Sequence, residues 1–218
     1  MKRVIIVGGG KSVTAGIESG LWEKIQGQEI WSLNYTFKMM PYLPTRQIWV
    51  DTTFWKNNSQ DMERLAQQGV LCHAKMNTRY LGIDYIKTHE VGRDLKEKNK
   101  IFSGAMGLCG MFALGLAIKE GYDEIYLLGY DWGTKSENDI NTHFYQGKTT
   151  YISSGVGRPQ VYLQGSSPKK GVHDFDIYKE HKTVYNVSVE SNINTFPKLS
   201  FSQFYEQIKT EEKSIPIL

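Results

Sequence analysis

A chain of 218 residues, 40% of them hydrophobic and 22% charged, has the composition of a soluble globular protein and can bury a full core. Its net charge of +3 is too small to indicate nucleic-acid or membrane binding, and no apolar run approaches the roughly 20 residues of a membrane span. The two cysteines, Cys72 and Cys109, form no CxxC pair, and the N-terminal run VIIV is too short for a secretory signal. We therefore expect a cytoplasmic protein without disulfides.

The first half of the chain is predicted to alternate between strands and helices. Residues 3–7, RVIIV, are β-branched and apolar and predict a buried parallel strand, and a loop leading into a helix follows over 11–25. The polar stretch 77–100 gives no clear assignment. Further elements are predicted as strands at 29–34, 46–51 and 70–74 and as a helix at 59–69.

The second half contains a small-residue helix at 103–121 followed by a strand at 123–131, which is a typical α/β unit. Residues 133–171 are polar and rich in Gly and Ser, which predicts a lid or mobile insertion within a single domain of residues 1–218. The last predicted elements are a short helix at 173–181, a strand at 183–188 and, at 196–208, a turn that leads into a terminal helix.

This alternation predicts an α/β fold with a doubly wound, mostly parallel, Rossmann-like sheet and a small lid insertion. Ligands of such sheets bind at the carboxyl ends of the strands. Four residues at predicted strand ends are therefore expected to line one crevice: Gly8, Asn34, Asp51 and Asp131.

The stretch GGGKS at 8–12 resembles two nucleotide-binding motifs and satisfies neither. A Walker A loop would need its first glycine at position 5, which is Ile5. The dinucleotide motif GxGxxG would need its third glycine at Val13, and Asn34 stands where a ribose-binding acid is expected. Two interpretations remain: a turn that presents backbone N–H groups to a phosphate, or a tight strand–helix turn that binds nothing.

Two histidines are candidates for a general base. His173 lies beside Asp174 and Asp176, which could orient its ring, and His143 lies among aromatic residues of the predicted lid. Either could instead be a histidine without a catalytic role. The five histidines show no zinc-binding spacing, so we predict no metal site.

Asp131 is either a turn cap or a site carboxylate, which could also bind Mg²⁺ with a nucleotide.

Several segments together resemble the bacterial sialyltransferases that use CMP-sialic acid, and the broader Rossmann-like group that includes pterin-pyrophosphokinase-like proteins. The most continuous matches are SGAMGLCGMFALGLAIKEGYDEIYLLGYDW at 103–132 and YNVSVESNINTFPKLSF at 185–201. Shorter matches are VIIVGGGKSV at 4–13, SLNYTF at 32–37 and GVHDFD at 171–176.

This resemblance implies a role for each matching residue. His173 would be the general base, and Tyr145 or Tyr151 would donate a hydrogen bond to the departing phosphate. Neither a metal nor a cofactor is needed in that family. The residues that would bind the donor nucleotide are Gly8, Gly10, Ser12, Asn34, Ser103 and Gly104.

The chain departs from the family pattern at two places. The family's Asn-Gly-Pro-Ser turn is here Gly9-Gly10-Lys11-Ser12, in which Lys11 could add a phosphate contact. The third strand's usual Asn is Asp51, which would repel a phosphate or bind a ribose or base instead. The identity of the nucleotide and the sugar is therefore open.

The resemblance implies an inverting, His-assisted, metal-independent transfer of a sugar from a nucleotide-activated donor to a hydroxyl acceptor. The acceptor could be a glycan, a small molecule or a modified nucleic acid, and a homo-oligomer is compatible with the sequence. One alternative is a Mg-dependent pyrophosphokinase-like enzyme, with Asp51 and Asp131 as key carboxylates. The other is a non-catalytic nucleotide- or sugar-binding accessory protein.

Overall fold

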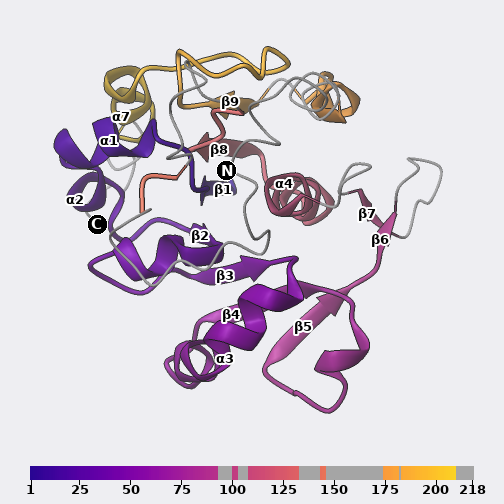
Figure 1. The fold of residues 1–218 in the computed structure, drawn as a ribbon. Helices are drawn as coiled ribbons and strands as arrows, with labels where there is room; N and C mark the ends of the chain where they lie inside the picture. Colours follow the sequence, from indigo (N-terminus) through magenta and orange to yellow (C-terminus); the bar gives the residue numbers. More distant parts are fainter. Residues whose placement is uncertain (93–99, 103–107, 133–142, 146–173, 182, 210–218) are drawn as a thin grey trace, which may run out of the picture.

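The computed structural model describes residues 1–92, 100–102, 108–132, 143–145, 174–181 and 183–209. Its main element is a seven-stranded sheet of order β5-β4-β3-β2-β1-β8-β9, in which every neighbouring pair is parallel. Figure 1 shows these strands in sequence from β5 at the bottom to β9 at the top. The strands are β1 Arg3–Val7, β2 Ile30–Leu33, β3 Arg46–Trp49, β4 Leu71–Lys75, β5 Ile86–His89, β8 Glu124–Leu128 and β9 Val184–Asn186.

The central strand β1 explains why the sheet needs a layer of helices on each face. Ile5 and Val7 belong to one buried cluster, and Val4 and Ile6 belong to another on the opposite face. Alternate side chains of a strand point to opposite faces, so an apolar run such as VIIV requires cover on both sides.

Helices from the two ends of the chain and from its first half cover the Ile5 face. The buried cluster around Ile5 and Val7 includes side chains of four helices: α1 Val13–Glu18, α2 Leu21–Ile25, α3 Thr52–Gln67 and α7 Phe201–Lys209. The Val4 face is covered by α4 Cys109–Lys119 and by the 3-10 helix η3 Asp174–Tyr178. In Figure 1, α1, α2 and α7 lie to the left of β1 and β8, and α4 lies to their right. The expected α/β fold with a doubly wound parallel sheet is thus confirmed.

Shorter elements complete the described part of the chain. The 3-10 helix η1 Asn34–Met39 follows β2, and η2 Thr78–Tyr80 follows β4. A separate two-stranded sheet pairs β6 Val91–Gly92 with β7 Ile101–Phe102 in parallel. The strands β5, β6 and β7 were not predicted: β5 carries three polar residues in four, and β6 and β7 are only two residues long.

The helix predicted at 59–69 begins earlier than expected, at Thr52. Asp51 accepts a hydrogen bond from the Thr53 N–H at 2.7 Å and caps the helix there. Asn58 has non-helical dihedral angles inside the element, and its side-chain amide donates to Phe54 O at 2.7 Å. The Asn-Asn-Ser stretch is therefore a kink within one helix, although its residues favour a helix start.

Two histidines face each other between β4 and β5, of which His73 is buried and His89 partly buried. His73 Nδ1 lies 2.9 Å from His89 Nε2, their rings are stacked, and His89 packs edge-on against Phe112 of α4. Burial, followed by the charges of Arg46 and Lys87, lowers the pKa of His73 to about 3. Burial and Lys87 lower the pKa of His89 to about 4, against an opposing effect of Glu120. Both rings are therefore neutral in the native protein at pH 7.

This pair should make the protein sensitive to acid. The unfolded chain binds a proton on each imidazole below about pH 6.5, whereas the native protein binds none until about pH 4. The free energy of unfolding should therefore fall as the pH drops from 6.5 to 4, by about 2 kcal/mol for each histidine at pH 5. Urea unfolding between pH 4.5 and 7.5 measures this slope.

A matched pair of variants isolates the effect. His89→Gln cannot become charged and should make the slope shallower by about one proton. His181→Gln changes an exposed histidine and should leave the slope as in the wild type. Equal slopes for the two variants would show that the buried pair is not the source.

Candidate functional site

The order of the strands locates the candidate site at the carboxyl edge of the sheet, between β1 and β8. The chain winds from β1 outward to β5 in one direction and then returns to place β8 on the other side of β1. This reversal is the topological switch point at which open α/β sheets bind ligands. Gly8 follows β1 directly, and Gly129 follows β8.

The loops after β1 and β8 remain hydrogen-bonded beyond the strands. Gly8 N donates to Leu128 O at 2.7 Å, and Gly10 N donates to Gly129 O at 2.9 Å. A Cβ on Gly10 would lie 2.5 Å from Gly129 O and 2.6 Å from Asp131 Oδ2. Gly129 itself has φ +70, which suits glycine. The glycines therefore permit the two loops to approach each other closely.

The side chain of Asp131 reaches from the loop after β8 to the start of α1. Its Oδ2 accepts a hydrogen bond from Ser12 N at 2.8 Å. Its Oδ1 and the Ser12 Oγ are buried without a hydrogen-bond partner. Orphaned buried polar atoms are uncommon in proteins and call for an explanation, such as a ligand or a water that pairs with them.

A short segment, 143–145, packs over the glycine turn. Phe144 N donates to Gly9 O at 2.9 Å, and the His143 ring stacks on Tyr145 with centroids 5.1 Å apart. A Cβ on Gly9 would collide with the His143 ring and lie 2.8 Å from the Tyr145 hydroxyl. Burial lowers the pKa of His143 to about 4, so its imidazole is neutral at pH 7.

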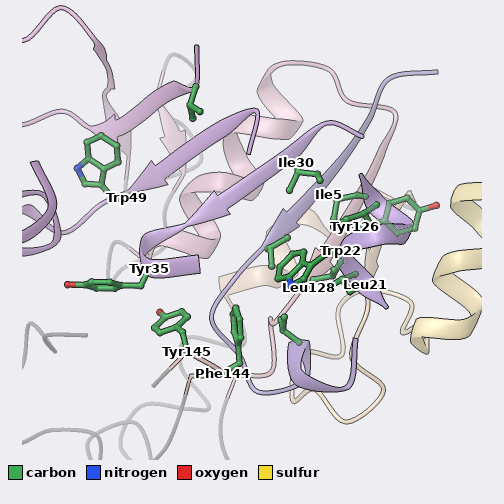
Figure 2. Close-up of a cluster of buried hydrophobic side chains, with 14 of the residues drawn as sticks. Ile5, Leu21, Trp22, Ile30, Tyr35, Trp49, Tyr126, Leu128, Phe144 and Tyr145 are labelled. Atoms are coloured by element: carbon green, nitrogen blue, oxygen red, sulfur yellow. The ribbon is translucent and has the colours of Figure 1, made fainter. Parts of the chain in front are cut away.

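Tyr145 lies in the core. Its side chain is 1% exposed, and its ring centroid lies 6.0 Å from that of Tyr35. Figure 2 shows Tyr145 beside Phe144. The Tyr145 hydroxyl is close to Gly9, at the edge of the glycine turn. Residues 143–145 are the described part of the predicted lid 133–171, and the remainder lies outside the described residues.

Asn34 and Asp51 follow the next two strands along the same edge. Asn34 has φ +50, and its carbonyl accepts a hydrogen bond from Gln47 Nε2 at 2.9 Å. Asp51 caps α3 and also lies near Cys109, at the start of α4. Burial, followed by this carboxylate, raises the pKa of the Cys109 thiol to about 12, which leaves it unreactive.

The structure thus brings part of the predicted site together. Gly8, Gly10, Ser12 and Asp131 form one contiguous group, and Lys11 is exposed beside them. Asn34 and Asp51 extend the group along the edge. Four predicted site residues lie outside the described residues: Ser103, Gly104, Tyr151 and His173.

Sequence reasoning missed one contact at the turn. Thr36 Oγ1 donates to Gly8 O at 3.3 Å, so the segment after β2 helps to hold the glycine turn. Its place two residues after Asn34, inside the segment SLNYTF, was the available signal.

Among the residues that the structure describes, no three His, Cys, Asp or Glu side chains gather closely enough to hold a metal ion. No helix in the described part of the chain combines the length and apolar character that crossing a bilayer requires.

The fold and the position of the site define a Rossmann-like α/β protein with a candidate ligand site at the switch point of its sheet. No family model and no curated protein matches the sequence. Among solved structures, the chain is similar to the MAf glycosyltransferase from Magnetospirillum magneticum AMB-1, with a TM-score of 0.55 and 14% sequence identity.

That likeness covers 92% of this chain and 34% of the other, so this chain spans about a third of the length of that glycosyltransferase. At this identity, the likeness establishes a shared fold.

The close approach of the two loops predicts the cost of a methyl group at Gly10. Gly10→Ala should lower the free energy of unfolding by about 3 kcal/mol, because the backbone oxygen of Gly129 cannot move aside cheaply. Gly27→Ala is the matched control, since Gly27 has φ +83 and open space around it, and it should cost about 1 kcal/mol. Urea unfolding compares the two, and a similar cost for both would contradict the tight packing.

Proposed function

We propose that this protein is a glycosyltransferase that transfers a sugar from a nucleotide-activated donor to a hydroxyl acceptor. The observation that carries the proposal is the Ser12–Asp131 pair at the switch point, which holds two buried polar atoms without partners. The fold shared with a solved glycosyltransferase supports it.

The charge of Asp131 decides which part of the donor it binds. A carboxylate repels a phosphate but accepts hydrogen bonds from hydroxyl groups. We assign Asp131 Oδ1 and Ser12 Oγ to hydroxyl groups of the donor's ribose or sugar. Asp51, also a carboxylate, would bind a ribose or base farther along the edge, next to Asn34.

The phosphate of the donor then needs a cation or free donors nearby. Gly8 and Gly10 already donate their amides to Leu128 O and Gly129 O. We therefore assign the phosphate to the exposed ammonium of Lys11, with the glycines giving the ligand close access to the backbone.

The proposed chemistry is the one that the resemblance to the sialyltransferases implies. A base removes the proton from the acceptor hydroxyl, whose oxygen attacks the anomeric carbon as the bond to the nucleotide phosphate breaks. Attack from the face opposite to the leaving group inverts the anomeric centre. His173 is the proposed base, Tyr145 and Tyr151 are proposed hydrogen-bond donors to the leaving phosphate, and Ser103 and Gly104 are proposed donor contacts.

The geometry favours this function over Mg-dependent phosphotransfer. That alternative needs Asp51 and Asp131 to act together on one ion. Their strands, β3 and β8, are separated by β2 and β1, which puts the strand axes roughly 14 Å apart. Each carboxylate also already accepts a backbone N–H, Asp51 from Thr53 and Asp131 from Ser12 in the loop after β1.

A panel of nucleotides tests the donor class. CMP, UDP, GDP, ADP and ATP, with their sugar conjugates, are compared by thermal shift with and without Mg²⁺. A nucleotide sugar should raise the melting temperature without Mg²⁺, since a ligand of the native state stabilises it by mass action. Asp131→Ala should weaken that binding about tenfold through the lost hydroxyl contacts. A shift seen only with ATP and Mg²⁺ would instead indicate phosphotransfer.

Turnover of the donor that binds tests the base and separates an enzyme from a binding protein. His173→Ala should lower the rate of sugar transfer or donor hydrolysis by about 10²- to 10⁴-fold and leave donor affinity unchanged. His181→Ala alters an exposed histidine and serves as the control. Full activity in His173→Ala would remove His173 as the base, and tight binding without any turnover in the wild type would indicate a non-catalytic protein.

A further inference from the structure

The last residue of β9 and the segment after it bind three consecutive carbonyl groups of the loop that follows β8. The carbonyl oxygens of Tyr130, Asp131 and Trp132 each accept a hydrogen bond from a residue within 186–192. We call this group of contacts the carbonyl clamp. It holds the backbone on both sides of the Asp131 side chain.

Buried side chains form the first part of the clamp. Ser191 Oγ donates to Tyr130 O at 2.7 Å, and Asn186 Nδ2 donates to the same oxygen at 3.2 Å. Asn186 Nδ2 also donates to Ser191 Oγ at 2.9 Å, and Ile193 N donates to that hydroxyl at 3.0 Å. Asn186 is fully buried and Ser191 nearly so, so water cannot replace these bonds at low cost.

Asn192 forms the second part of the clamp. Its backbone N–H donates to Asp131 O, and its Nδ2 donates to Trp132 O, both at 2.9 Å. Trp132 has φ +52, a left-handed conformation that costs a bulky residue about 1 kcal/mol or more. The Asn192 side chain therefore stabilises a strained backbone directly after Asp131.

We propose that Asn186, Ser191 and Asn192 are positioning residues that direct the Asp131 carboxylate onto the glycine turn. The backbone sets the direction of the Cα–Cβ bond of a side chain, and the clamp fixes the peptide groups at both ends of Asp131. From this position Oδ2 accepts the hydrogen bond of Ser12 N, and Oδ1 is buried without a partner. The functional meaning of this arrangement rests on the proposed role of Asp131 in donor binding.

Hydrogen exchange of the Ser12 amide reports the position of Asp131 without any ligand. Asp131 Oδ2 is the acceptor for that amide, which lies far from the clamp residues in sequence. Asn192→Ala and Asn192→Asp both remove the Nδ2 donor at an exposed position, so global stability should change little. Each should speed Ser12 exchange about five- to tenfold, measured by NMR under conditions in which local opening limits exchange.

Two further variants bracket this result. Asn194→Ala is the matched control, because Asn194 is also exposed in the same loop but contacts Lys198 instead of the loop that follows β8. It should leave Ser12 exchange unchanged. Asp131→Ala removes the acceptor itself and sets the upper limit of the effect.

The outcomes separate this proposal from the proposed function. Unchanged Ser12 exchange in both Asn192 variants, or an equal increase in Asn194→Ala, would overturn the positioning role. If Ser12 exchange responds as expected, the affinity for CMP, UDP, GDP and ADP and for their sugar conjugates is measured next. Weaker binding in the Asn192 variants extends the role to the donor. No binding by the wild type would overturn the proposed function and leave the positioning of Asp131 established.

Discussion

The backbone hydrogen bonds between the loops that follow β1 and β8 are the contact on which the candidate site depends. Gly8 and Gly10 donate to Leu128 O and Gly129 O, continuing the pairing of two parallel strands past their ends. This is possible only where neither loop carries a Cβ at the point of contact. Because the loops are joined, Asp131 reaches Ser12, and the polar atoms of the site lie at the switch point of the sheet.

The same contact changes how the glycine turn should be understood. Counting residues excluded a Walker A loop and a dinucleotide motif, but could not say what the glycines contact. Gly9 packs against His143 and Tyr145, and Gly10 packs against Gly129 and Asp131. These partners are more than a hundred residues away in sequence, so their position depends on the complete sheet. The glycines therefore have a packing role, whatever ligand binds above them.

Most of the sheet could be predicted from the sequence because its strands are apolar runs that end at turn residues. RVIIV is the plainest example, and its bounds were predicted to the residue. Two kinds of feature could not be predicted. The strand β5 contains Lys87, Thr88 and His89 and owes its pairing to β4 rather than to its own pattern. At Asn58 the local preference for a helix start is overridden by the packing of Phe54 and Met62 on either side, so that α3 continues through a kink.

The strand-end position of four candidate site residues could be predicted from the sequence, whereas the contacts that hold the backbone around Asp131 could not. Gly8, Asn34, Asp51 and Asp131 follow from the rule that parallel strands present their carboxyl ends at one edge. The carbonyl clamp involves Asn186, Ser191 and Asn192, whose role appears only once β9 is paired with β8. The segments that carry the sialyltransferase resemblance therefore meet in space: residues 8–12, 129–132 and 186–192 share one hydrogen-bonded network. These three segments are far apart in the sequence, so the position of Asp131 depends on all of them together.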